Sequence, residues 1–239
     1  MSTPTTRVAF HTMGCKTNFS ETSTISREMM AHGLQQVSFR DKADVYVLNS
    51  CSVTENADKE ARKLIRQARR RNPDAAVAVI GCYAQLHPAE IAAIPGVELV
   101  VGAAEKFNLF AHLSSLKANR KATVIQSPIE TVQSFQTSFS VAERTRTYLK
   151  IQDGCNYNCS FCTIPLARGR SRSDNIANTV NIAQQIAATE AREIVLTGVN
   201  IGDYGLDSDE NFFQLIQALD NIDGIDRFRI SSIEPNLLS

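Results

Sequence analysis

The sequence has no long apolar run, no recognisable secretory leader and no net charge. No apolar run approaches the length of a membrane-spanning helix, which needs about 20 residues. Residues 1–7 contain no apolar segment of the kind found in signal peptides, so we expect a cytoplasmic protein without a membrane partner. The 25 Lys and Arg residues balance the 25 Asp and Glu residues, so the overall charge predicts no class of partner.

Six cysteines are present, and without a leader they are not expected to form a disulfide framework. In a reducing compartment, cysteines more often bind metals or take part in catalysis. Apolar residues make up 43% of the 239-residue chain and charged residues 21%, a composition that can bury a core and is not typical of disorder. The cysteines are therefore the first residues to consider as a functional site.

Residues 1–115 alternate between short apolar runs and helical patterns. Helices are predicted at residues 20–32 and 57–71, and the second has an apolar stripe along one side. This alternation predicts an open, parallel α/β sheet. The four apolar runs, typical of strands buried on both faces, lie at residues 8–10, 45–48, 76–80 and 97–101.

Three cysteines follow the first three of these runs: Cys15, Cys51 and Cys82, here called the N-terminal trio. The carboxyl ends of parallel strands lie at one sheet edge, and this edge forms the ligand crevice of open α/β sheets. We therefore expect the three thiols to meet at one site. The alternative is that each cysteine is a small buried apolar residue, as cysteine often is.

The pattern changes after residue 115. Residues 116–141 are polar and rich in Ser, Thr and Gln, which indicates a linker with one strand near residues 122–126. Residues 142–239 return to a strand–helix repetition. The repetition ends after its third strand, far short of a closed eight-stranded barrel, so we expect an open sheet or a fragment. Strands are predicted at residues 148–151, 193–197 and 227–231, and helices at 176–189 and 212–219.

The strongest motif is Cys155-x3-Cys159-x2-Cys162, whose cysteines are here called the C-terminal trio. A structural zinc ion needs four ligands, but no cysteine follows Cys162 and the last histidine is His112. Three thiolates can instead hold three irons of a four-iron cluster and leave the fourth iron open to a ligand. The spacing therefore favours an iron–sulfur cluster, with zinc as the alternative.

The C-terminal trio, with an aromatic residue before its last cysteine, resembles the motif of the radical S-adenosylmethionine superfamily. The segments around both trios are similar to the methylthiotransferases, which carry a cysteine domain before the radical domain. Within that family, Gly14-Cys15-Lys16-x-Asn18 and Val53-Thr54-x-x-Ala57 are most similar to the branch that modifies threonylcarbamoyladenosine in tRNA, the MtaB-like branch. The branches for isopentenyladenosine and for a ribosomal protein have different residues after the first two cysteines.

The resemblance implies a division into an N-terminal auxiliary-cluster domain at residues 1–115, a linker at 116–141 and a radical S-adenosylmethionine domain at 142–239. The last would be the first part of a partial TIM barrel. The family continues through further barrel strands into a small RNA-binding domain, and neither follows Ser239. We therefore expect a truncated chain.

The resemblance also implies two [4Fe-4S] clusters and S-adenosylmethionine as cofactors. The C-terminal trio would hold the cluster that binds and cleaves S-adenosylmethionine, and the N-terminal trio would hold a second cluster that carries the sulfur to be inserted. The expected product is a methylthio group at carbon 2 of threonylcarbamoyladenosine beside the tRNA anticodon, where bases can be splayed out. The expected partners are tRNA and an electron donor such as a flavodoxin or ferredoxin.

Four residues outside the trios are predicted to contact cofactor. Tyr157 and Phe161 lie inside the cysteine loop, where an aromatic ring can shield a cluster or place an adenine, and core packing is the alternative. Gly198 ends a strand where the family's Gly-rich segment meets the methionine amino group, although a plain turn also explains it. Glu234 follows the next strand and is expected to face the ligand, or else to be a surface carboxylate.

Residues 59–72 contain seven cations and one acid. Helical spacing places five of these cations on one side of the predicted helix at residues 57–71. Solvated helix faces usually mix both signs, so this face is predicted to contact RNA phosphates, and an ordinary solvated surface is the alternative. The five residues are Lys59, Arg62, Lys63, Arg66 and Arg70.

Two weaker patterns remain. Arg168, Arg170 and Arg172 follow the cysteine loop, and arginine forks suit a phosphate or the carboxylate of a cofactor. His11 and His87 flank the expected edge of the N-terminal site, where each would donate a hydrogen bond to a cluster ligand. The alternative is that both are capped or surface histidines. Three other functions stay open: a zinc-dependent RNA-binding module, an electron-transfer iron–sulfur protein, and another methylthiotransferase branch.

Overall fold

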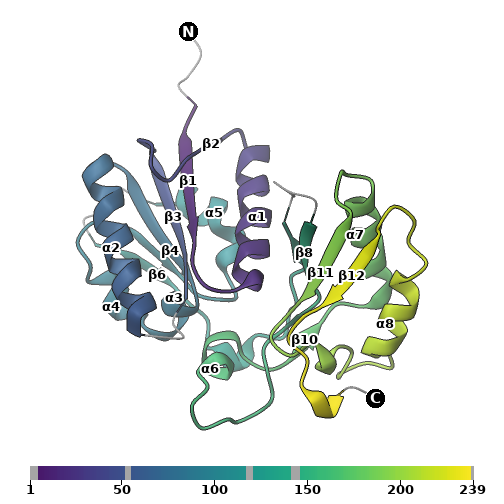
Figure 1. Cartoon of the computed structure of the whole chain (residues 1–239). Helices are drawn as coiled ribbons and strands as arrows, with labels where there is room; N and C mark the ends of the chain where they lie inside the picture. Colours follow the sequence, from purple (N-terminus) through teal and green to yellow (C-terminus); the bar gives the residue numbers. More distant parts are fainter. Residues whose placement is uncertain (1–4, 52–54, 117–120, 141–145, 238–239) are drawn as a thin grey trace. The chain divides into compact units, whose positions relative to one another are not determined.

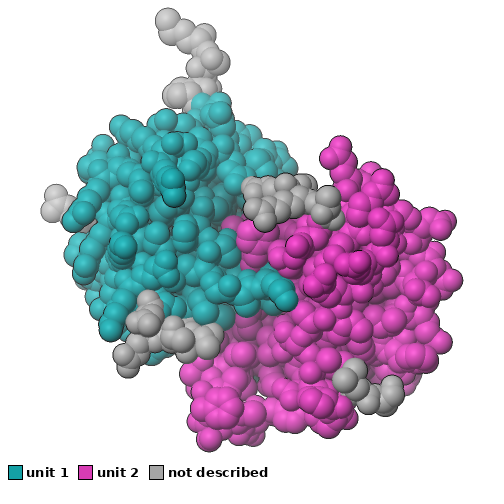
Figure 2. Space-filling view, in the orientation of Figure 1, with its two compact units in different colours: residues 1–18, 25–131 teal, residues 19–24, 132–239 magenta. Residues whose placement is uncertain are grey.

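The computed structural model describes residues 5–51, 55–116, 121–140 and 146–237 (Figure 1). The chain divides into two compact units, which Figure 2 shows in different colours. Unit 1 comprises residues 1–18 and 25–131, and unit 2 comprises residues 19–24 and 132–239. Val53 and Thr54 of the sequence motif lie outside the described residues.

Unit 1 is built on a six-stranded sheet in the order β2-β1-β3-β4-β5-β6. Every neighbouring pair is parallel, so all the carboxyl ends lie at one edge of the sheet. The strands are β1 (Arg7–Thr12), β2 (Gln35–Val37), β3 (Val45–Ser50), β4 (Ala76–Gly81), β5 (Leu99–Val101) and β6 (Thr123–Ile125). The sequence-based prediction of an open parallel α/β sheet is confirmed.

Helices cover both faces of this sheet (Figure 1). They are α1 (Lys16–Ala31), α2 (Glu55–Arg71), α3 (Cys82–Leu86), α4 (Pro88–Ala92) and α5 (Leu109–Ser114). Tyr46 and Leu48 pack in one core with α2, α3 and α4, whereas Val47 packs in a second core with α1 and α5. This burial on both faces explains why the strands appear in the sequence as continuous apolar runs.

Two segments of unit 1 differ from the sequence-based prediction. Helix α1 begins at Lys16 rather than at residue 20, because its first turns bury polar side chains and so lack the apolar periodicity that marks a helix. Strand β6 confirms the strand predicted near residues 122–126. Because β6 pairs with β5, residues 116–131 are counted with unit 1, although the sequence indicated a linker there.

Unit 2 contains a four-stranded sheet in the order β12-β11-β8-β7 and a separate antiparallel pair, β9 and β10. Strands β8, β11 and β12 are parallel to one another, whereas β7 is antiparallel to β8. Among the described strands, β12 pairs with β11 alone. The strands are β7 (Ser138–Phe139), β8 (Arg146–Lys150), β9 (Gln152–Asp153), β10 (Arg172–Ser173), β11 (Glu193–Thr197) and β12 (Arg227–Ile230).

Three helices belong to unit 2: α6 (Ile164–Arg168), α7 (Ile176–Ala187) and α8 (Phe212–Leu219). Helices α7 and α8 bury Ile186 and Leu215 in one core with Ile194 of β11. The bounds of β11 and α8 are those predicted from the sequence. A reciprocal pair of hydrogen bonds between Asn211 and Gln214 caps the start of α8.

No helix among the described residues combines the length and the apolar character that a membrane crossing requires.

Candidate functional site

The N-terminal trio lies at the carboxyl edge of the unit 1 sheet. Cys15 is the N-cap residue of α1 and follows β1, Cys51 directly follows β3, and Cys82 opens α3 directly after β4. These three strands are neighbours in the sheet. Cys15 is exposed, which does not fit the alternative of a buried apolar cysteine, whereas Cys51 and Cys82 are half-buried and Cys51 packs against the apolar core. None of the three cysteines forms a disulfide.

Gly14 brings the backbone beside Cys15 against Cys51. Its φ of +89° lies in the left-handed region that favours glycine. A β-carbon at this position would lie 2.8 Å from both the Cβ and the Sγ of Cys51. The glycine is therefore needed twice, once for the backbone conformation and once for the close approach to a thiol of the trio.

The buried side-chain amides of Asn18 and Asn49 link the segment that carries Cys15 to the segment that carries Cys51. Asn18 Nδ2 donates to the carbonyl oxygens of Met13 at 3.0 Å and Ser50 at 3.1 Å, which lie just before Cys15 and Cys51 in the chain. Asn49 Nδ2 donates to the carbonyl oxygen of Asn18 at 3.0 Å. Sequence reasoning missed this function of the two asparagines, although Asn18 belongs to the motif quoted for the family.

Replacing Gly14 with alanine should cost more stability than replacing Gly33. Gly33 has nearly the same φ, +87°, but nothing lies within 4 Å of a β-carbon built there. Both variants carry the left-handed strain of about 1–2 kcal/mol. Gly14→Ala adds overpacking against Cys51, for a further loss of about 1–3 kcal/mol. Urea unfolding of the two variants measures this difference, and equal losses would contradict the contact between Gly14 and Cys51.

His11 packs against an aromatic ring, and His87 lies near a carboxylate. The His11 ring packs against Phe39 with centroids 5.1 Å apart. Burial lowers the pKa of His11, and the charge of Glu60 acts in the opposite direction. His87 lies between α3 and α4, with its Nδ1 3.8 Å from a carboxylate oxygen of Glu90. These surroundings fit the alternative of packed and surface histidines.

The C-terminal trio lies in the loop between β9 and α6. The Cys155 N–H donates to the carbonyl oxygen of Gly169 at 3.0 Å, and the Cys162 N–H donates to that of Cys159 at 3.0 Å, so the loop folds back on itself. Cys159 is exposed, and the other two thiols are half-buried and free. Burial raises the pKa of the Cys155 thiol, a hydrogen bond from the Tyr157 N–H lowers it, and Asp203 and the two other cysteines raise it.

The donor set fits an iron–sulfur cluster better than a single metal ion. Within the described part of the chain, no three His, Cys, Asp or Glu side chains form a group that could hold one metal ion, as zinc would require. In a four-iron cluster each thiolate binds a different iron, so its ligands stand farther apart. Each trio offers three cysteines that form no disulfide, a donor set that fits such a cluster with one iron left open.

The aromatic residues of the loop are exposed. Phe161 is 89% exposed and Tyr157 is 39% exposed, so the core-packing alternative is wrong for both rings. The Tyr157 hydroxyl accepts a hydrogen bond from Asn236 Nδ2 at 3.1 Å. Glu234 is exposed, and its backbone N–H donates to Asn200 Oδ1 at 3.3 Å, a position that fits a surface carboxylate.

The turn after β11 approaches the cysteine loop through Gly198. A β-carbon at Gly198 would lie 2.8 Å from Oε1 and 2.9 Å from the backbone oxygen of Gln152, which is itself three residues before Cys155. A side chain at this position would push the turn away from Gln152. The close approach to Gln152 is therefore sufficient to explain the glycine at this position.

Two buried polar side chains, Asn200 and Asp203, follow the same turn. Burial raises the pKa of Asp203, and side-chain hydrogen bonds with Ser171 and Asn200 lower it. The charge of Asp203 in turn raises the pKa of the Cys155 thiol in the cysteine loop.

Five charged side chains form a buried ion cluster in unit 2. Lys150 Nζ lies 3.0 Å from Glu21 Oε1 and 3.4 Å from Asp153 Oδ2. Arg168 Nη1 lies 3.2 Å from Glu21 Oε1 and 2.7 Å from Asp153 Oδ1. Arg172 Nη2 lies 3.3 Å from Asp153 Oδ2. Arg168 therefore faces two carboxylates in the interior, which corrects its expected role as a contact for phosphate or cofactor.

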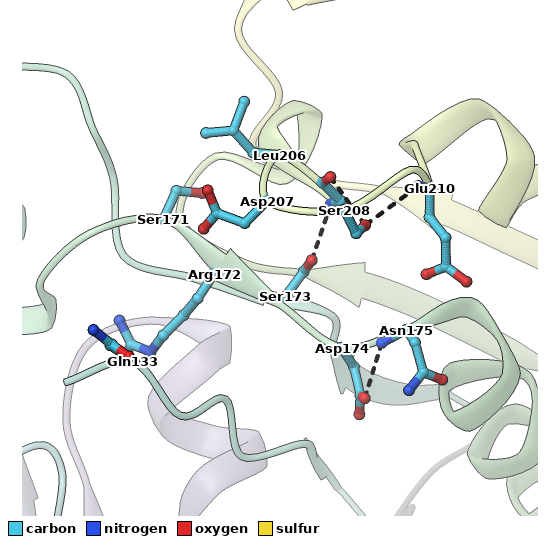
Figure 3. Close-up of a pocket in the computed structure, with 11 residues that line it drawn as sticks. Gln133, Ser171, Arg172, Ser173, Asp174, Asn175, Leu206, Asp207, Ser208 and Glu210 are labelled. Atoms are coloured by element: carbon cyan, nitrogen blue, oxygen red, sulfur yellow. Dashed lines mark hydrogen bonds between the residues drawn. The ribbon is translucent and has the colours of Figure 1, made fainter.

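A pocket of about 320 Å³, lined mostly by polar and charged residues, lies beside β10 (Figure 3). Its wall includes Ser173, whose Oγ accepts a hydrogen bond from the Gly205 N–H at 2.9 Å. Glu210 is also in the wall and accepts from the Ile176 N–H at 2.8 Å, so its carboxylate caps α7. Arg172, one of the three arginines that follow the cysteine loop, is the one predicted contact residue that lines this pocket.

The basic face of α2 is largely exposed. Lys59, Lys63, Arg66 and Arg70 are exposed at helical spacing, as the sequence predicted. Arg62 differs, because it is half-buried and forms an ion pair with Glu90 of α4. Four cations of the predicted set therefore remain open to a polyanion.

Comparison with known proteins gives two family matches. The family described as "Uncharacterized protein family UPF0004" matches residues 7–102, and the "Radical SAM superfamily" matches residues 149–238. The first match contains the N-terminal trio and the second contains the C-terminal trio. The two matches do not overlap in sequence. Most residues of the first match belong to unit 1, and the residues of the second belong to unit 2.

Relatives with assigned names match nearly the whole chain. The threonylcarbamoyladenosine tRNA methylthiotransferase MtaB of Bacillus subtilis is 43% identical, over 97% of this chain and 52% of the relative. The enzyme of that name from Aquifex aeolicus is 40% identical, over 95% and 56%. The tRNA-2-methylthio-N(6)-dimethylallyladenosine synthase of a Sulfurihydrogenibium species is 28% identical, over 94% and 53%. The chain thus spans about half the length of these relatives.

Two solved structures share the fold. Both are of the radical S-adenosylmethionine methyltransferase TsrM from Kitasatospora setae, one with cobalamin and a [4Fe-4S] cluster bound, the other with its tryptophan substrate and the S-adenosylmethionine analogue aza-SAM bound. Their TM-scores are 0.55 and 0.54, over 83% and 82% of this chain and 50% and 48% of theirs. At 14% and 15% identity, the likeness concerns the fold alone.

Proposed function

We propose that the chain belongs to the radical S-adenosylmethionine methylthiotransferase family and acts in inserting a methylthio group at carbon 2 of threonylcarbamoyladenosine in tRNA, on the basis of its two family matches and its named relatives. The observation that carries this proposal is the presence of two trios of cysteines, one in each family match. The choice of threonylcarbamoyladenosine is supported by the names of the two relatives at 40–43% identity.

The cofactors of the proposal are S-adenosylmethionine and two [4Fe-4S] clusters. The C-terminal trio would hold one cluster and the N-terminal trio the other, each with one iron open. When bound, these groups supply the electron that cleaves S-adenosylmethionine and the sulfur that is transferred. The chain itself supplies thiolate ligands on loops whose backbone is held by hydrogen bonds to buried amides.

The proposed contacts to S-adenosylmethionine lie around the cysteine loop. Tyr157 and Phe161 are exposed there and available to cover a bound adenine. Gly198 lets the turn after β11 approach the loop, and Glu234 follows β12 at the corresponding strand end. Asn200 and Asp203 are buried polar side chains that follow the same turn, and they are further proposed contacts. The other proposed partners are an electron donor, such as a flavodoxin or ferredoxin, and a cytoplasmic tRNA.

The first experiment tests the chemistry. The chain is reconstituted without oxygen, with iron and sulfide, and then receives a reductant and S-adenosylmethionine. About eight iron atoms per chain and formation of 5′-deoxyadenosine are expected. Bound iron without 5′-deoxyadenosine would instead identify an electron-transfer protein, and bound zinc without iron would identify a zinc module.

The second experiment tests the substrate. Nucleosides from total tRNA are compared between a strain that contains the gene and a strain that lacks it. The methylthio form of threonylcarbamoyladenosine should disappear in the deletion strain, and the unmethylthiolated nucleoside should accumulate. Loss of the methylthio group from dimethylallyladenosine instead would assign the chain to the other tRNA branch.

The basic face of α2 is proposed as a contact for tRNA phosphates. Replacing both Arg66 and Arg70 with alanine should weaken tRNA binding and reduce the slope of log K against log salt by about 2, since each phosphate contact contributes about one unit. The matched control replaces Arg227 and Arg229, two exposed arginines that pair with Glu193. Filter binding at several salt concentrations measures both slopes, and equal slopes would count against a contact at α2.

A further inference from the structure

Gln152 is a fully buried amide at the start of β9, where it pairs in register with Ser173 of β10. A glutamine side chain has two N–H donors and one oxygen that accepts two hydrogen bonds. In a buried site, an amide whose donors and acceptors are all used fixes the groups that it binds. All these capacities of Gln152 are used, and its partners come from two separate loops.

The donor end of Gln152 holds the start of the cysteine loop. Nε2 lies 2.7 Å from the carbonyl oxygen of Gly154 and 3.1 Å from that of Asp153. It also lies 2.9 Å from Ser171 Oγ, on the segment that returns from the loop. Gly154 directly precedes Cys155, and a β-carbon at Gly154 would lie only 2.0 Å from the carbonyl oxygen of Arg170. The backbone next to Cys155 is therefore fixed from two sides.

The acceptor end of Gln152 holds the turn after β11. Oε1 accepts hydrogen bonds from the backbone N–H groups of Val199 and Asn200, both at 2.9 Å. Gly198 leaves the space that this approach requires. The turn carries Asn200, a buried residue whose Oδ1 accepts a hydrogen bond from the Glu234 N–H at 3.3 Å. The Gln152 side chain thus fixes the backbone before Cys155 relative to the backbone of Val199 and Asn200.

We propose that Gln152 is a positioning residue that fixes the cysteine loop relative to the turn at residues 198–200. The inference rests on the proposed function. S-adenosylmethionine bound to a cluster on the cysteine loop would extend to this turn, so the loop and the turn would need a fixed relative position. Small displacements of the groups that hold a reacting molecule reduce its productive binding strongly. Gln152 would act through these backbones without touching the cluster or the cofactor.

Two substitutions of the full chain separate the two ends of the amide. Gln152→Glu keeps the size and the acceptor oxygen but replaces the donor by a second oxygen that faces the carbonyl groups of Asp153 and Gly154. Gln152→Leu removes both ends at similar volume. The matched control is Gln185→Glu, which makes the same change at an exposed position of α7.

The readout is the electron paramagnetic resonance spectrum of the reduced cluster, titrated with S-adenosylmethionine. We expect both Gln152 variants to bind iron like the wild-type chain but to need about 10–100-fold more S-adenosylmethionine for the spectral change, as is usual when the support of a ligand is removed. Gln185→Glu should titrate like the wild type. Folded Gln152 variants that also titrate like the wild type would overturn the inference.

A second measurement needs neither a variant nor a bound cluster. Hydrogen exchange in the wild-type chain should be slow at the Val199 and Asn200 amides, although both lie outside regular secondary structure. Exchange at the rate of an open loop would overturn the inference even if the Gln152 variants do not fold. A wild-type chain whose spectrum does not respond to S-adenosylmethionine would refute the proposed function instead, and the exchange rates would still decide whether Gln152 holds the turn.

Discussion

Replacing Cys159 with alanine should remove about four of the iron atoms bound by the reconstituted chain and reduce 5′-deoxyadenosine formation to background. Cys159 is exposed in the loop, so its loss should affect ligation and leave the fold intact. Two thiolates remain in the C-terminal trio after the substitution, which is too few to hold a four-iron cluster firmly. Iron analysis and chromatography of the nucleoside product measure the two effects.

The neighbouring Ser160 provides the control. Ser160→Ala changes the same exposed part of the loop without removing a thiol and should bind iron like the wild-type chain. Cys82→Ala should also lose about four iron atoms but keep 5′-deoxyadenosine formation, because it belongs to the other trio. If Cys159→Ala kept the full iron content, the C-terminal trio would not be a cluster site.

Replacing Glu21 with alanine should destabilise unit 2 by about 3–5 kcal/mol, the usual cost of removing one partner from a buried ion pair. The Glu21 carboxylate is fully buried and faces both Lys150 and Arg168. Without it, these two cations and Arg172 have only the Asp153 carboxylate within the buried ion cluster. Urea unfolding, followed by a probe in unit 2, measures the change.

Glu28→Ala is the matched control for this prediction. Glu28 lies on the same helix, α1, but its side chain is partly exposed, so the loss should stay below about 1 kcal/mol. Glu21→Gln keeps the shape of the side chain and removes only its charge, and most of the destabilisation should remain. Equal losses for Glu21→Ala and Glu28→Ala would show that the buried ion cluster does not stabilise the unit.

The regular core was predictable from the sequence because its signals are local. Strand β11 and helix α8 appear with the predicted bounds, since apolar side chains repeat there with the period of the element. The positions of Cys15, Cys51 and Cys82 at one sheet edge followed from parallel topology alone. Strands that are buried on both faces appear in the sequence as continuous apolar runs, so their positions can be predicted.

The supporting polar residues were not predictable in the same way. Gln152 and Glu21 act through partners that lie 47 and 129 residues away in the sequence, and no periodic pattern links such pairs. Lys150 ends an apolar strand, which is a weak sign of a buried charge, but its partner cannot be identified without the fold. Arg168 was predicted to bind a phosphate or a cofactor carboxylate because arginine suits that role. The structure instead buries Arg168 in ion pairs with Glu21 and Asp153.

The position of β12 at the end of its sheet has a practical consequence for handling the chain. Within the described residues, one side of this strand has no neighbour, and Ile230 on it is 43% exposed. An open row of amide and carbonyl groups beside exposed apolar surface is a template on which a foreign strand can add. Concentrated solutions of the chain should therefore self-associate through this edge, and iron loading is best carried out at high dilution.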